Sequence, residues 1–517
     1  MILIRAIATV GGLTMVSRVF GFARDVLIAK ILGAGPVADA FFVAFKFPNL
    51  FRRLFAEGAF SAAFVPIFAG LLEAEGKSRA RVFAEQALSV LFWALLVMVA
   101  VMEIAMPLMM LVFAPGFAAD PEKFDLTVVL ARIAFPYLLL ISLVSLLGGV
   151  LNSLGRFAAA AAAPILLNVC MILSILLLAP LTPTPGHALA WGVFAAGVVQ
   201  LVWLYLACAR AGMALRLPRP RITPEVKLLL RRAVPVAIGA GVYQLNLLVD
   251  TVLASFLPSG SISYLFYADR VVQLPLGVIG VAVGTALLPL LSRQLRAGHT
   301  AAAHYNQNRA LEFACLLTLP AAAALLVIAE PIVSVLFQRG AFSVVEAQAT
   351  AAALMAMALG LPAFMLVKAL TPGFFARGDT ATPVKIAAAA MAINVVCSVI
   401  LMQFLLHVGI ALAMAISAWV NAGALAVVLR RRGFLVIDAR NKERLPRILF
   451  ATAVMCGALW IAERAVGDWL AGDEVMRAMA LALLVASGAL AFAVTAQASG
   501  AAGLRDLRGL MRGKDPA

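Results

Sequence analysis

The side chains most able to bind a ligand are charged residues that lie inside long apolar stretches near the amino end. Six are basic and three are acidic, namely Arg18, Arg24, Lys30, Lys46, Arg52 and Arg53 against Asp25, Asp39 and Glu57. Six minus three leaves three positive charges that ion pairs within the group cannot cancel. Charges inside a bilayer are costly and usually face a cavity or a partner. We therefore expect a water-filled cationic cavity, although Lys30, Arg52 and Arg53 are equally well explained as helix-end residues that extend to water.

Two further charged residues, Asp269 and Arg270, lie near the start of an apolar stretch in the second half of the chain. Their place in an internal repeat is roughly that of Lys46 in the first half, so basic groups from both halves would line one cleft. Arginine binds phosphate oxygens through paired hydrogen bonds, and a low dielectric strengthens the attraction. The pattern predicts an anionic substrate such as a phosphate or diphosphate. A cationic drug would instead need an acidic cleft.

The composition places these charges in a membrane protein. Of 517 residues, 64% are hydrophobic and 13% are charged, and the mean hydropathy is +1.03. Soluble domains average roughly 45–50% apolar and about 25% charged residues. One membrane crossing needs about 20 apolar residues, so this length holds a dozen or more crossings. The composition therefore excludes a water-soluble protein and leaves little room for an aqueous catalytic domain.

Apolar runs bounded by glycine, proline or charge clusters predict an all-α, polytopic membrane protein with about 14 transmembrane helices. Six are expected at residues 6–32, 37–72, 82–113, 126–154, 158–178 and 188–209. Six more are expected at residues 226–257, 265–295, 310–337, 347–376, 384–406 and 410–429. The last two are expected at residues 448–470 and 475–496.

The two sets of six helices resemble each other. The spacing P-x5-F-x2-G occurs at Pro107, Phe113 and Gly116, and again 224 residues later at Pro331, Phe337 and Gly340. Duplication of a six-helix unit explains this and other matches in the same order. We predict an N-terminal lobe at 1–215, a parallel C-terminal lobe at 222–434, two additional helices at 442–500 and a basic tail at 501–517. Alternating access between two such lobes is the expected mechanism.

Basic residues concentrate in alternate connections between the predicted helices. Residues 210–232 and 430–447 are rich in Lys and Arg, whereas residues 32–37, 182–187 and 257–263 contain none. Because cytoplasmic loops carry an excess of Lys and Arg, both termini are expected in the cytoplasm. The net charge of +16 is thus spread over many short loops, which argues against a nucleic-acid partner.

The residues that usually mark an enzyme or a metal site lack the necessary spacing. The five cysteines are far apart and form no CxxC pair, and the four histidines form no helical zinc motif. No phosphate-binding GxxxxGK[ST] loop or GxSxG nucleophile motif occurs. A membrane enzyme acting on a polyprenyl diphosphate would also need clustered carboxylates or a catalytic histidine. We therefore expect a transporter rather than an enzyme, since a non-transporting scaffold would have no reason to keep cations within its spans.

Three stretches resemble one known family. SRVFGFARD begins at Ser17, ADAFFVAFKFPNLFRRLFAEGAFSAAFVP begins at Ala38, and YADRVVQLPLGV begins at Tyr267. They are similar to motifs of the MurJ (MviN) lipid II flippases, which belong to the multidrug/oligosaccharidyl-lipid/polysaccharide exporter superfamily. The resemblance implies a protein of the bacterial inner membrane that moves lipid II, the undecaprenyl-diphosphate-linked peptidoglycan precursor, from the cytoplasmic to the periplasmic leaflet. A flippase for another polyprenyl-diphosphate-linked oligosaccharide, or a multidrug exporter of the same fold, is the alternative.

The resemblance also implies a set of substrate-binding residues. By the family's motifs these are Arg18, Arg24, Asp39, Lys46, Arg52, Arg53 and Arg270, with Asp25, Glu57, Asp269 and Gln273 as supporting residues. Some members have a glutamate where this chain has Gln273, so a role that needs a negative charge there is in doubt. The last two helices are expected to form a groove for the polyprenyl tail.

Two energy sources for transport are compatible with the sequence. Some family members resemble cation-coupled transporters, and Asp250, Asn394 and Ser398 would be the ligands of a monovalent cation here. The alternative is the membrane potential alone, which supplies roughly 2.3 kcal/mol per charge per 100 mV. No other cofactor is expected. The expected partners are lipid II, the phospholipid bilayer and proteins of cell-wall synthesis or division.

Overall fold

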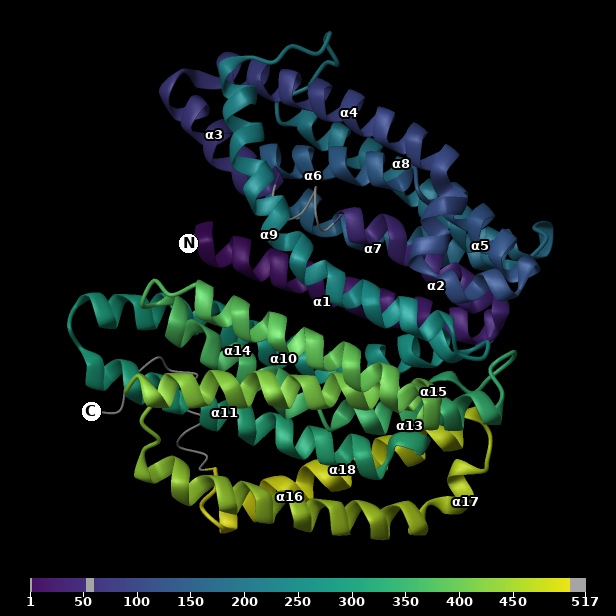
Figure 1. Ribbon diagram of the computed structural model, residues 1–517, viewed down its shortest axis with the longest axis vertical. Coiled ribbons are helices and arrows are strands. Elements are labelled where there is room, and N and C mark those ends of the chain that lie inside the picture. The colour runs from purple at the N-terminus through teal and green to yellow at the C-terminus, as the bar shows by residue number, and fades with distance from the viewer. Residues whose placement is uncertain (1, 53–59, 503–517) are drawn as a thin grey trace. The chain divides into compact units, whose positions relative to one another are not determined.

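The computed structural model describes residues 2–52 and 60–502. Over these ranges the regular elements are helices, with no strand (Figure 1). Nine segments of the described chain are long and apolar enough to cross a membrane. In the described ranges each predicted span consists mainly of helix, and residues 53–59 of the second span lie outside these ranges. The predicted all-α, polytopic membrane fold is therefore confirmed.

The chain divides into two compact units, the first comprising Met1–Ser263 with Arg339–Phe342 and the second the rest. The helices of the first unit are α1 (Ile2–Leu32), α2 (Pro36–Arg52), α3 (Ser61–Ala74), α4 (Gly76–Phe113), η2 (Pro115–Ala119), α5 (Pro121–Ala134), α6 (Tyr137–Ser153), α7 (Phe157–Leu177), η3 (Ala179–Leu181), α8 (Pro185–Arg210) and α9 (Pro224–Ser255). Helix α9 packs against α3, α4 and η2. The lobe boundaries expected from the duplication, 1–215, 222–434, 442–500 and 501–517, stay a prediction about the repeat.

The second unit continues from α10 (Ser261–Arg296), which begins at the boundary between the units. It contains α11 (Thr300–Val327), α12 (Ala329–Phe337), α13 (Val344–Ala358), α14 (Leu361–Phe375), α15 (Ala381–Arg431), α16 (Ala439–Ala465), α17 (Gly467–Leu470) and α18 (Glu474–Ala498). Helix α11 packs against α13, α14 and α16, and α16 packs against α18. The two helices without a counterpart in the duplication, α16 and α18, are therefore anchored to each other and to the unit.

Proline interrupts one predicted span at the same place in each half. The span at 126–154 consists of α5 and α6, which meet at Phe135 and Pro136. The span at 347–376 consists of α13 and α14, which meet at Leu359 and Gly360 with Pro362 just beyond. Proline lacks the amide that a helix interior requires and clashes with the preceding turn. Pro136 and Pro362 are 226 residues apart, so the interruption belongs to the duplicated unit.

The glycine of the repeated P-x5-F-x2-G spacing makes the same contact in both halves. A β-carbon at Gly116 would lie 2.3 Å from the carbonyl oxygen of Ser255, and one at Gly340 would lie 2.3 Å from that of Lys30. Lys30 and Ser255 are 225 residues apart, each in the last turn of the first helix of its half. Each half thus places its glycine against the first helix of the other half. Both contacts lie within the first unit.

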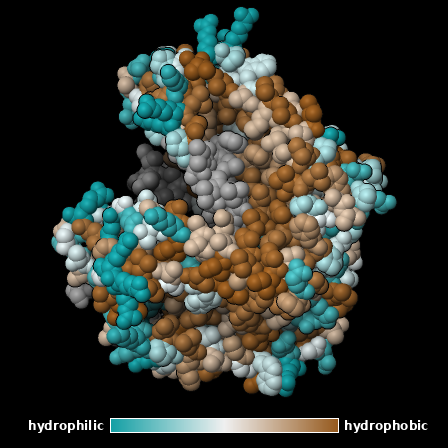
Figure 2. All heavy atoms as spheres, viewed as in Figure 1, coloured by the Kyte–Doolittle hydropathy of each residue, from teal (hydrophilic) through white to brown (hydrophobic). Residues whose placement is uncertain are grey.

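The outer surface is strongly apolar. Figure 2 shows hydrophobic side chains over a broad band of the visible face and hydrophilic side chains gathered toward its margins. Ile104 is 81% exposed and Phe404 is 79% exposed. Soluble monomers rarely expose contiguous apolar patches larger than a few hundred Å². This surface suits contact with lipid.

Candidate functional site

Arg24 is buried on α1 and held by two neighbours. Its Nε and Nη2 donate to Asp25 Oδ1 at 3.0 Å and 2.7 Å, and its Nη1 donates to Asn168 Oδ1 on α7 at 2.9 Å. Asn168 Nδ2 in turn donates to the carbonyl oxygen of Ser17 at 2.9 Å. The guanidinium is therefore fixed in position, and Asp25 supplies its counter-charge. Sequence reasoning selected Arg24 and Asp25, and Asn168 was not among the selected site residues.

Gly21 lies directly against the amide of Asn168. A β-carbon at Gly21 would lie 3.4 Å from Asn168 Nδ2, at the short end of ordinary van der Waals contact. Helix α7 therefore packs closely on this turn of α1. A buried charge is tolerated when it is paired and hydrogen-bonded, which describes the Arg24 guanidinium.

Asp39, in the first turn of α2, is enclosed by four hydrogen bonds. Its carboxylate accepts from the amides of Gly260 and Ser263 at 2.7 Å and 2.9 Å, from Ser263 Oγ at 2.6 Å, and from Lys123 Nζ at 2.9 Å. Its exposed fraction is 1%. In this conformation the carboxylate ties α2 to α5, to the connection that follows α9 and to the first turn of α10. A substrate contact at Asp39 stays a prediction.

Lys123 was not among the residues that sequence reasoning selected. It is 5% exposed, and beyond Asp39 it donates to Ser259 Oγ at 3.1 Å and lies 4.1 Å from the centre of the Phe117 ring. The local sequence gives only an indirect signal: Asp120 caps α5 by accepting from the Lys123 amide at 3.2 Å, and Pro121 follows. These residues set where α5 begins. The contact with Asp39, 84 residues away, arises from tertiary packing.

The other predicted cations of the first unit are more accessible. Arg18 and Lys46 are exposed, and Lys46 Nζ donates to Thr251 Oγ1 on α9 at 3.1 Å. Arg52 is partly buried at the end of α2, where its Nε donates to Asn49 Oδ1 at 3.1 Å. Arg53 and Glu57 lie outside the described residues. Lys30 is exposed in the last turn of α1, as the helix-end interpretation expects.

In the second unit, the predicted residues occupy successive turns of α10. Arg270 is partly buried, with its Cζ 4.5 Å from the centre of the Phe266 ring. Gln273 Nε2 donates to Asp269 Oδ2 one turn earlier. A glutamate at position 273 could not donate this bond in its charged form. The amide at this position therefore stabilises Asp269 directly.

The predicted cation ligands lie on two helices. Asn394 and Ser398 are 1% and 0% exposed and sit one turn apart on α15, whereas Asp250 is partly buried on α9. Within the described ranges, no group of three or more His, Cys, Asp or Glu residues could hold a metal ion. A site formed by Asp250, Asn394 and Ser398 stays a prediction.

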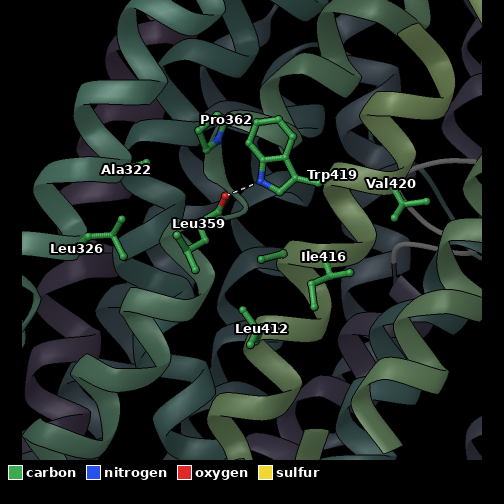
Figure 3. Close-up of a pocket in the computed structure, with 9 residues that line it drawn as sticks. Ala322, Leu326, Leu359, Pro362, Leu412, Ile416, Trp419 and Val420 are labelled. Carbon is green, nitrogen blue, oxygen red and sulfur yellow. Dashed lines mark hydrogen bonds between the residues drawn. The ribbon is translucent and has the colours of Figure 1, made fainter. Parts of the chain in front are cut away.

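A cavity of about 550 Å³ lies in the second unit between α11, the α13–α14 junction and α15. Figure 3 shows its lining, where Trp419 Nε1 donates to the carbonyl oxygen of Leu359 at 2.8 Å. The lining carries no charged side chain. This cavity therefore cannot supply the phosphate-binding groups expected from the sequence.

Outside the predicted spans, Asp379 lies in the connection between α14 and α15 and forms an ion pair with Arg432, just beyond the end of α15. It accepts from the Thr382 amide at 2.9 Å and from Arg432 Nη1 at 2.5 Å. Hydrogen bonds from Thr382, and then from Arg432, lower the pKa of Asp379 from its ordinary value of 3.8 to about 2. At neutral pH this carboxylate is ionised.

Comparison with known proteins gives consistent matches over nearly the whole chain. Residues 28–480 match the family described as Lipid II flippase MurJ. A protein of Rhizobium tropici named Probable lipid II flippase MurJ is 50% identical over 465 residues, covering 89% of this chain and 87% of that protein. A protein of the same name from Rhizobium meliloti (strain 1021) is 47% identical over 519 residues, covering 98% of this chain and 96% of that protein.

Solved structures support the same architecture. The structure titled Lipid II flippase MurJ, inward closed conformation, has a TM-score of 0.78 at 23% identity and covers 96% of this chain and 99% of its own. An inward-facing multidrug resistance MATE family transporter of the MOP superfamily has a TM-score of 0.66 at 14% identity, covering 82% of this chain and 97% of its own. At these identities the likeness concerns the fold.

Proposed function

The chain belongs to the MurJ family, and from this premise we propose that it is a transporter that flips lipid II from the cytoplasmic to the outer leaflet of the bacterial inner membrane. The observation that carries the proposal is the extent of the family match, which runs over residues 28–480 and includes the charged motifs that begin at Ala38 and Tyr267. The fold supports the proposal, because nine segments of the described chain are long and apolar enough to cross a membrane and many large apolar side chains are exposed.

Three basic side chains suit the diphosphate of this substrate. Arg18 and Lys46 are exposed on α1 and α2, and Arg270 is partly buried on α10. Arginine can bind two phosphate oxygens at once, and lysine acts as a point charge. Arg24 would act beside them with its orientation set by Asn168, and Arg52 and Arg53 would attract the substrate near the end of α2.

Orientation follows from the distribution of basic residues. The connections around residues 210–232 and 430–447 would face the cytoplasm, with both termini on the same side. Lipid II would then enter where these loops lie, and alternating access between the two six-helix halves would release it on the opposite side.

Helices α16 and α18 would guide the polyprenyl tail. Both expose large apolar side chains, among them Phe450, Ile461 and Leu490 at 59%, 65% and 66% exposure. A hydrocarbon tail can remain in contact with such a surface while the polar headgroup crosses. The membrane potential, or a monovalent cation bound at Asp250, Asn394 and Ser398, would drive the cycle, and proteins of cell-wall synthesis or division would use the product.

The test is complementation in a bacterium whose own lipid II flippase is depleted. Expression of this chain should restore arrival of lipid II at the outer leaflet, measured by its accessibility to an external enzyme. Arg18→Ala should reduce the rate by about tenfold or more, and Arg18→Lys should recover part of it because one charge returns without the paired geometry. Arg231→Ala, at an exposed arginine near the start of α9, is the matched control. Failure of the unmodified, membrane-inserted chain to restore lipid II transfer would contradict the proposal.

A further inference from the structure

The buried contact between Lys123 and Asp39 joins three separate parts of the first unit. Lys123 lies on α5, Asp39 on α2, and Ser259 and Gly260 on the connection into α10, with Ser263 in the first turn of α10. The side chains of Lys123 and Asp39 are 4% and 1% exposed. The contact is thus a dry ion pair that also holds a connecting segment.

Asp39 and Lys123 make different contacts within this arrangement. Asp39 accepts two backbone amides and one hydroxyl from the connecting segment. Lys123 Nζ neutralises the carboxylate at 2.9 Å and holds Ser259 Oγ at 3.1 Å, while the Phe117 ring covers the ammonium at 4.1 Å. A buried carboxylate without a counter-charge is strongly destabilised. Asp39 can therefore hold the segment only while Lys123 is present.

The segment Ser259–Ser263 is where the chain leaves the first unit and enters the second. It contains Gly260 at φ +97°, a left-handed conformation that favours glycine. Any rearrangement that carries the start of α10 away from α2 must break the bonds to Asp39. The pair thus holds the chain at the boundary where it passes from the first unit to the second.

We propose that Lys123 is a positioning residue of the transport cycle, which by neutralising Asp39 keeps the Ser259–Ser263 segment latched on α2 until the opposite state forms. The role of Lys123 in a transport cycle rests on the proposed flippase function. Lys123 itself touches no substrate in this role. It sets the relative free energy of the latched and unlatched states.

The experiment measures latch opening and global loosening in the same molecule. Ile262 is 2% exposed within the latched segment, and Cys208 is a natural thiol on α8 with 0% exposure. A chain that retains Cys208, has its other four cysteines replaced and carries Ile262→Cys is reconstituted in liposomes and treated with a maleimide. Modification of Cys208 reports loosening of the whole unit, and modification at position 262 reports the latch.

We expect Lys123→Met to raise the labelling rate at position 262 by about tenfold or more, with the rate at Cys208 unchanged, because local opening costs less free energy than global unfolding. Lys123→Arg should stay nearer the parent because the charge is kept. The double variant Asp39→Asn, Lys123→Met should label no faster than Asp39→Asn alone, since both act on one contact. Glu122→Gln, an exposed neighbour on α5, is the matched control and should match the parent.

Lipid II transfer in the depleted strain is measured for the same variants with the native cysteines in place. Loss of transfer together with selective labelling at position 262 supports the proposal. An equal increase in the labelling rates of both thiols would overturn the proposal, because Lys123 would then only stabilise the fold. An unchanged labelling rate at position 262 would also overturn it. If the parent chain transfers no lipid II but the variants show the expected labelling pattern, the proposed flippase function is contradicted and the latch is still supported.

Discussion

The two contacts of the repeated glycines share a close approach to a carbonyl oxygen and differ in their polar support. Gly116 lies against Ser255 and its amide donates to Ser255 Oγ at 3.0 Å. Gly340 lies against Lys30, and there the amide of the next residue, Ala341, donates to the Lys30 carbonyl oxygen at 2.8 Å. The first contact uses a side-chain hydroxyl as acceptor and the second uses only main chain.

This difference shows which part of the duplicated unit is constrained. The close approach depends on the missing β-carbon, so glycine occurs in both halves at the same spacing. The hydrogen bond can be made by different groups, so Ser255 and Lys30 need no common side chain. Lys30 contributes its carbonyl oxygen and leaves its ammonium exposed.

The largest expected effect comes from adding the missing β-carbon. Gly340 combines φ of +59° with a 2.3 Å clash, whereas Gly116 has only the clash. We expect Gly340→Ala to lower the free energy of unfolding by about 2–5 kcal/mol and Gly116→Ala by about 1–3 kcal/mol, from backbone strain and overpacking. Denaturant unfolding in detergent measures both.

A matched variant separates the two causes. Gly76 has φ of +82° and no atom within 4 Å of an added β-carbon, so Gly76→Ala reports backbone strain without a clash. A loss for Gly76→Ala as large as that for Gly340→Ala would show that the contact with Lys30 adds nothing.

A smaller effect is expected from the hydroxyl that distinguishes the two contacts. Ser255→Ala removes the acceptor of the Gly116 amide and should lower the free energy of unfolding by about 1 kcal/mol. Ser255 Oγ also donates to the carbonyl oxygen of Val252, and Ser487→Ala removes a similar bond, from Ser487 Oγ to Leu484, on α18. Equal losses for the two variants would mean that the bond to Gly116 does not contribute.

The smallest effect is expected at a contact that, unlike the glycine contacts, depends on charge. The folded pKa of Asp379 is about 2, below its ordinary value of 3.8. Its ionised form therefore stabilises the fold above pH 3.8, and this contribution disappears as the pH falls from 3.8 toward 2. Melting temperatures of the parent and Asp379→Asn should converge as the pH is lowered from 5 to 2.5. A difference that stays constant over this interval would contradict the shifted pKa.

The sequence did not identify the residue that each glycine contacts, for the same reason that it missed Lys123. The spacing P-x5-F-x2-G revealed that Gly116 and Gly340 are equivalent, but it could not show which helix each one touches. Lys123 lies in a short acidic stretch, where a solvated lysine is the ordinary expectation. Its burial depends on how α5 packs on α2 and on where the segment after α9 returns.

The charged pair at Arg24 and Asp25 was accessible to sequence reasoning because the two residues are neighbours. Arg24 and Asp25 are adjacent in the covalent chain, and charged residues within an apolar stretch usually face a cavity or a partner. Asn168, 144 residues from Arg24, completes the pair only after α7 packs on α1. Sequence reasoning thus found the residues and left their polar partners undefined.

The amino-acid sequence by itself determined the helical membrane fold, the duplication and the family, because hydrophobic run length, proline and glycine positions and motif residues are local properties. Only the tertiary structure decided which charges are enclosed and which are exposed. That outcome depends on contacts between residues far apart in the chain, such as Lys123 with Asp39 and Gly340 with Lys30. The free energy of a buried charge is set by whatever packing brings beside it, and no local pattern specifies that neighbour.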